Sequence, residues 1–91
     1  MPHTPEEKSR VLARVKRVKG QMEALERALE AGAEYGPVLQ QIAAVRGAIN
    51  GLMSQVLESH MREEFTQLPK TAKARNERVD EMVSLVRSYL K

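Results

Sequence analysis

The sequence predicts an all-α protein of three helices, and three observations support this prediction. Two long stretches repeat their apolar residues in alternating steps of four and three, the spacing of a helix that packs along another helix. Only a short connection around Gly36-Pro37 separates them. A third stretch, after Pro69, again has one apolar face. We therefore expect helices over about 5–31, 37–65 and 72–90, in a single domain covering residues 1–91.

The first helix has a recognisable start and stop. Thr4 is placed as the N-cap, Pro5 suits the first helical position and Glu7 closes a capping box. Gly32 follows the last apolar residue, where glycine commonly ends a helix. We call the row of apolar residues along one side of each long helix its seam. Because both helices carry a seam with the same spacing, we expect them to fold back as an antiparallel hairpin. The seam of the first helix consists of Val11, Val15, Val18, Met22, Leu25 and Leu29.

The second helix is poor in charge. Arg46 is the one ionic side chain between Tyr35 and Leu57. A helix without a charged face is normally surrounded by protein, and a chain of 91 residues cannot supply all of that cover itself. We therefore expect a homo-oligomer. The seam of this helix consists of Val38, Ile42, Val45, Ile49, Leu52 and Val56.

The third helix begins after Pro69, which prevents the second from running on. Its apolar face should dock on the hairpin or on a neighbouring copy. The basic residues that lead into it are assigned no role, because they could simply keep the connection soluble. The apolar face consists of Val79, Met82, Val83, Val86 and Leu90.

Composition excludes several classes of function. The chain has no cysteine, so it forms neither a disulfide nor a reactive thiolate. No apolar run approaches the length of a membrane span, and the N-terminus does not resemble a signal peptide. We therefore expect a cytoplasmic protein with no membrane partner. His60 and Glu64 have no third catalytic group or glycine-rich loop nearby in sequence, so we do not expect an enzyme.

The charges of the first helix are polarised along its length. Six cations fall in a window that contains no acid, whereas acids dominate the rest of the helix. Such a window is either an ordinary solvated face or a nucleic-acid surface, and both interpretations stay open. Arg46 likewise suits either a basic surface or a buried structural partner. We name the cations the basic window: Lys8, Arg10, Arg14, Lys16, Arg17 and Lys19.

His60 and Glu64 lie four residues apart near the end of the second helix, so they project from the same face. One interpretation is a surface pair of little energetic consequence. The other is part of a metal site, which would need further ligands.

Three segments together resemble the CsoR/RcnR family of bacterial repressors: residues 14–21, Leu39-Gln-Gln-Ile-Ala-Ala-Val-Arg-Gly-Ala and Leu57-Glu-Ser-His60. The resemblance covers essentially the whole chain and is strongest to the formaldehyde-responsive FrmR branch, through Pro2-His3-Thr4-Pro5-Glu6, Asn50-Gly-Leu-Met and the closing Leu85-Val-Arg-Ser-Tyr-Leu-Lys. It implies a disc-shaped homotetramer, a dimer of dimers, that binds double-stranded operator DNA and releases it when a small effector binds between protomers. The implied DNA-binding residues are Arg14, Lys16, Arg17, Lys19 and Arg46.

The sequence departs from the family at one position, because Tyr35 stands where the family has its sensing cysteine. In the FrmR branch, one formaldehyde carbon would join the N-terminal Pro2 amine to that thiol. The implied effector site consists of Pro2, Tyr35, His60 and Glu64. The expected effector is therefore formaldehyde or a divalent metal. Three alternatives stay open beside formaldehyde: a nickel, cobalt or zinc sensor using the Pro2 amine, His3, His60 and Glu64; a repressor that has lost its sensor; or a metal-binding helical bundle with no DNA role.

Overall fold

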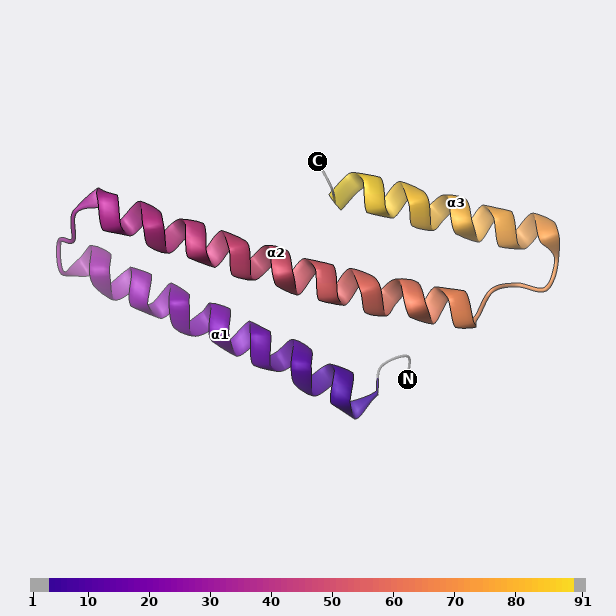
Figure 1. Cartoon of the computed structure of the whole chain (residues 1–91), viewed down its shortest axis with the longest axis horizontal. Helices are drawn as coiled ribbons and strands as arrows, with labels where there is room; N and C mark the ends of the chain where they lie inside the picture. The colour runs from indigo at the N-terminus through magenta and orange to yellow at the C-terminus, as the bar shows by residue number, and fades with distance from the viewer. Residues whose placement is uncertain (1–3, 90–91) are drawn as a thin grey trace. The chain divides into compact units, whose positions relative to one another are not determined.

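The computed structural model describes residues 4–89, which form three α-helices (Figure 1). These are α1 (Pro5–Glu30), α2 (Tyr35–Thr66) and α3 (Ala72–Tyr89). No strand occurs within residues 4–89, so the all-α prediction is confirmed. The chain divides into two compact units, residues 4–56 and 57–89, which are described separately below.

Both ends of α1 form as local chemistry predicts. Thr4 has an extended backbone, and its hydroxyl accepts a hydrogen bond from the Glu7 backbone N–H at 3.1 Å. At the other end, Gly32 has a φ of 78°, in the left-handed region. The Gly32 N–H donates to the Leu29 carbonyl and the Ala33 N–H donates to the Ala28 carbonyl. These two bonds satisfy carbonyls that the helix end would otherwise leave unpaired.

The second helix begins at Tyr35, two residues earlier than predicted. Proline suits the first turn, where a backbone N–H has no acceptor within the helix, so Pro37 does not have to be the first residue. The first bond of α2 runs from the Val38 N–H to the Glu34 carbonyl at 3.4 Å. In α3, the Thr71 hydroxyl accepts from the Ala74 N–H at 3.3 Å and so caps the start at Ala72. The predicted end of this helix at residue 90 lies outside the described residues.

In the first unit, α1 and the first part of α2 form the predicted antiparallel hairpin (Figure 1). The residues of each apolar seam form two rows, one covered within the hairpin and one exposed. Alternate seam residues, seven apart, are buried or half-buried in the hairpin. The intervening ones are between 42% and 48% exposed. The covered residues are Val11, Val18, Leu25, Val38, Val45 and Leu52. The exposed residues, named the outer seam, are Val15, Met22, Leu29, Ile42, Ile49 and Val56.

In the second unit, α3 packs against the last turns of α2, with Met82 buried between them. A part-buried ion pair also joins the two helices: Arg78 Nη1 donates to Glu64 Oε2 at 2.8 Å. None of the described helices is both long enough and apolar enough to cross a membrane.

Candidate DNA-binding surface and effector site

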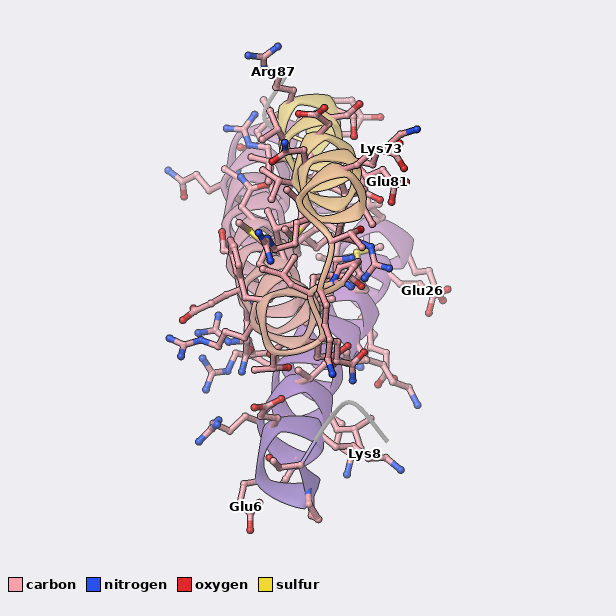
Figure 2. All side chains as sticks on the ribbon, turned by 90° about the vertical axis from the view of Figure 1, so that its right-hand side faces the viewer. Glu6, Lys8, Glu26, Lys73, Glu81 and Arg87 are labelled. Carbon is pink, nitrogen blue, oxygen red and sulfur yellow. The ribbon has the colours of Figure 1, made fainter. Side chains whose placement is uncertain are left out.

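The basic window lies on α1, and all six of its cations are exposed. None of them makes an ion pair within the described part of the chain. Figure 2 shows Lys8 projecting away from the α1 ribbon near its start and Glu26 projecting away further along. After the acidic first turn of this helix, the charge changes along the axis, from cationic over residues 8–19 to mostly acidic over residues 23–30.

Arg14 differs from the other cations because its side chain reaches across to α2. A Cβ atom built on Gly51 would lie 2.6 Å from Arg14 Nη1, so the guanidinium lies directly over the backbone of α2. This contact also indicates the register of the antiparallel hairpin. Counting five residues forward from Arg14 and five back from Gly51 places Arg46 at about the level of Lys19. Arg46 therefore lies at the same height along the hairpin as the end of the basic window.

Arg46 is exposed, and it makes no ion pair among residues 4–89. Within one chain it is therefore not a buried structural partner.

Lys8 and Lys16 both line a hollow on α1 of about 370 Å³, together with the apolar side chain of Leu12. The aliphatic parts of two lysines commonly border apolar surface in this way while their ammonium groups stay in water.

The implied effector residues are only partly described. Pro2 and His3 lie outside the described residues. Tyr35 is the first residue of α2, in the first unit, and its side chain is 75% exposed. No described residue restrains its ring or hydroxyl by a hydrogen bond.

His60 and Glu64 lie in the second unit, where they line one hollow of about 450 Å³. Both are half-buried. The sequence placed these two side chains on one face of the helix, and the structure brings them to one hollow. It also adds a group that sequence reasoning missed, since Arg78 lines the same hollow and binds the Glu64 carboxylate. The remaining lining residues are Glu81, Met82 and Leu85.

The hollow does not fit a metal ion within one chain. No group of three His, Cys, Asp or Glu side chains among the described residues is arranged to hold one. The Glu64 carboxylate, which would be a ligand, already accepts a hydrogen bond from Arg78 at 2.8 Å. A metal site of ordinary coordination number would therefore need ligands from outside this group.

Comparison with known proteins identifies the class. Residues 7–88 match the family model of metal-sensitive transcriptional repressors. The chain is 40% identical to the transcriptional repressor RcnR of Salmonella paratyphi B, and the match covers the full length of both proteins. It is 54% identical, again over both full lengths, to an uncharacterized protein from the region 5′ of bioA in Serratia marcescens. The chain therefore belongs to the CsoR/RcnR family of transcriptional repressors, whose members are regulators rather than enzymes.

Within this family, the structure resembles the formaldehyde-responsive regulator FrmR. The match is to its E64H variant from Salmonella enterica serovar Typhimurium, with a TM-score of 0.79 and 50% sequence identity. It covers 96% of this chain and 98% of that one. The predicted resemblance to the FrmR branch and the prediction of a transcriptional repressor are both confirmed.

Proposed function

We propose that the protein binds operator DNA through the basic window of α1 together with Arg46 of α2. The observation that supports this most is that the window is exposed and has no ion pair within the described residues. Cations that stabilised only the fold would be expected to face acids, whereas cations left free attract a polyanion. In this proposal Arg14, Lys16, Arg17, Lys19 and Arg46 contact phosphates of the duplex.

We further propose that the repressor is a homotetramer that works in the cytoplasm. The outer seam leaves six large apolar side chains uncovered along the hairpin, and α2 has almost no charge with which to face water. Packing against other copies would cover both features. Since each chain carries a formal +3, a tetramer would carry +12, which favours association with DNA.

The test of DNA binding is a titration on a duplex that carries the region upstream of the protein's own gene. If about six phosphates are neutralised on each face, log K should fall against log salt with a slope of roughly −5. Arg17→Ala should weaken binding and flatten the slope by roughly one unit, because one phosphate contact is lost. Arg27→Ala removes the same kind of side chain from the same helix, outside the window, and is the control.

Arg46→Ala distinguishes a role in DNA binding from a role in stabilising the fold. Because Arg46 is exposed, its loss should weaken DNA binding and leave the melting temperature unchanged. Wild-type affinity in both Arg17→Ala and Arg46→Ala would contradict the proposed surface.

For the effector, we propose a small aldehyde, formaldehyde in the first instance, captured at the N-terminus. Removal of Met1 would leave Pro2 with a secondary amine. Formaldehyde condenses with such an amine to an iminium ion with loss of water. A nucleophile then adds to the iminium carbon and loses a proton, so the product gains one carbon. Tyr35 is an exposed candidate through the ring carbon beside its hydroxyl. His60 and Glu64 are the remaining effector residues that the family resemblance implies.

A nickel, cobalt or zinc effector is the second candidate. The family is described as metal-sensitive, and His60 and Glu64 line one hollow. The likeness to the formaldehyde-responsive regulator FrmR, at 50% identity over nearly the whole chain, is what supports the aldehyde as the first candidate.

DNA release measured with formaldehyde and with each metal separates these candidates. Intact-protein mass spectrometry would show one added carbon, about 12 Da, only if an aldehyde bridge forms. Release by neither would indicate a repressor that has lost its sensor.

A further inference from the structure

The contact between Arg14 of α1 and Gly51 of α2 is tighter than any side chain at position 51 would allow. A Cβ atom built on Gly51 would lie 2.6 Å from Arg14 Nη1 and 3.8 Å from Arg14 Cζ. Real Cβ atoms essentially never come within 3.0 Å of such a neighbour. The guanidinium therefore fills the space that any other residue at this position would use for its side chain.

The backbone of α2 does not itself require a glycine at this position. Gly51 lies in the interior of the helix, and among the described glycines only Gly32 has a positive φ. Alanine would be the better helix former there. What glycine provides at position 51 is therefore the absence of a side chain.

We propose that Gly51 is a positioning residue for DNA binding, because it lets the Arg14 side chain lie across α2. This rests on the proposed role of Arg14 in contacting DNA. An arginine side chain has many rotamers, and its planar guanidinium binds a phosphate best when its orientation is fixed beforehand. Contact with the bare backbone of α2 removes some of these rotamers. It also sets the charge on the surface that α1 and α2 share, within a few turns of Arg46.

A methyl group at position 51 should displace Arg14 rather than disrupt the hairpin. The conflicting atoms are the far end of a long, flexible side chain, which can swing away while both helices keep their places. Gly47 provides a matched control, because it lies one turn earlier on the same helix and nothing lies within 4 Å of a Cβ built there.

The experiment compares four variants of the full chain with the wild type: Gly51→Ala, Gly47→Ala, Arg14→Ala and the double variant Gly51→Ala/Arg14→Ala. Binding to the upstream duplex is measured by fluorescence anisotropy over a range of salt concentrations. Light scattering and thermal unfolding are recorded on the same samples. We expect Gly51→Ala to weaken binding on the order of tenfold, with a melting temperature at or above that of the wild type. Gly47→Ala should bind as the wild type does.

The double variant tests whether Gly51 acts through Arg14. If it does, adding Gly51→Ala to Arg14→Ala should cause no further loss of affinity, because the group that glycine positions is already absent. A purely structural role would instead produce additive losses, and additive losses would overturn the proposal. So would a lower mass or a lower melting temperature in Gly51→Ala, or equal weakening in Gly47→Ala.

The two proposals fail in different ways. Weak binding by Arg14→Ala with full binding by Gly51→Ala would overturn the role of Gly51 and leave the DNA surface intact. Full binding by Arg14→Ala would remove Arg14 from that surface and overturn the role of Gly51 with it. The DNA surface itself fails only if the other cations of the window are equally dispensable.

Discussion

Glu64 and Glu58 each bind an arginine at 2.8 Å, but their surroundings differ. The Arg62–Glu58 pair lies within one helix, and its side chains are 74% and 63% exposed. The Arg78–Glu64 pair joins α3 to α2, and its side chains are 34% and 23% exposed. Water screens an exposed pair, so such a pair contributes little to stability. Removing one partner of a more buried pair leaves the other charge poorly compensated and is more costly.

We therefore expect Glu64→Gln to lower the free energy of unfolding by about 1–2 kcal/mol. Glu58→Gln makes the same chemical change at an exposed pair and should cost less than about 0.5 kcal/mol. Urea unfolding at one fixed protein concentration measures both, since stability of an oligomer depends on concentration. Equal costs for the two variants would show that burial does not govern the Arg78–Glu64 pair.

Tyr35 stands where the family has its sensing cysteine, so restoring a thiol there should increase the response to formaldehyde. Tyr35→Cys should make DNA release more sensitive to formaldehyde, because a thiol is a far better nucleophile toward an iminium carbon than a tyrosine ring. The thiol loses its proton as the N–CH₂–S bridge forms, and the mass gain is again about 12 Da. Tyr35 is 75% exposed, so its replacement should leave the melting temperature nearly unchanged.

The gained response should also require a free N-terminus. The control is a Tyr35→Cys protein with an N-terminal tag left in place. Because the tag blocks the Pro2 amine, the gained response should be abolished. A wild-type protein that already releases DNA at equally low formaldehyde, with the same mass gain, would show that a thiol is not needed.

At the scale of elements, the sequence predicted what depends on local chemistry. The Thr4 cap, the Gly32 stop and the heptad spacing of both seams follow from short-range rules, and the structure shows all three. The start of α2 was placed two residues late because proline is compatible with more than one position in a first turn.

Contacts between elements were harder to predict. Spacing placed His60 and Glu64 on one face, but it gave no reason to select Arg78 among the cations at the start of α3 and just before it. These cations are Lys70, Lys73, Arg75 and Arg78. It also placed Arg14 beside the seam without showing that its guanidinium crosses to Gly51. Both contacts depend on the register between helices, which a single sequence does not fix.

The end of α1 provides an element-scale prediction. Gly32→Ala should destabilise the protein by about 1 kcal/mol, because a φ of 78° is unfavourable for any residue with a Cβ. Gly36→Ala is the matched control: Gly36 lies in the first turn of α2 without a positive φ, and nothing lies within 4 Å of a Cβ built there. It should be neutral or slightly stabilising. Thermal unfolding compares the two, and a destabilised Gly36→Ala with an unaffected Gly32→Ala would reverse the expectation.

At the scale of the whole molecule, the divided seams are the main feature. Each long helix uses every second seam position within its own hairpin and exposes the alternate one. In an isolated hairpin, each helix would need only one row of apolar residues, the row that faces the other helix. The outer seam is a second apolar row at the same heptad spacing, and it indicates a second packing partner. The chain contains few aromatic residues with which to build a larger core of its own. Among residues 4–89, four apolar residues have an exposed fraction below about a tenth. We infer that other copies of the chain cover the outer seam, and that this assembly completes a hydrophobic core which one chain forms only in part.

The last prediction tests this inference at the outer seam. Light scattering at micromolar concentration should give the mass of a tetramer for the wild type. Ile49→Asp places a charge in the middle of the outer seam, where it would be buried without a partner on assembly, so the mass should fall. The melting temperature should fall with it, because the folded state loses the stabilisation that association provides. Ser84→Asp adds the same charge at an exposed position of α3, outside both the outer seam and the charge-poor helix, and should leave the mass unchanged. A monomeric wild type, or a tetrameric Ile49→Asp variant, would contradict assembly through the outer seam.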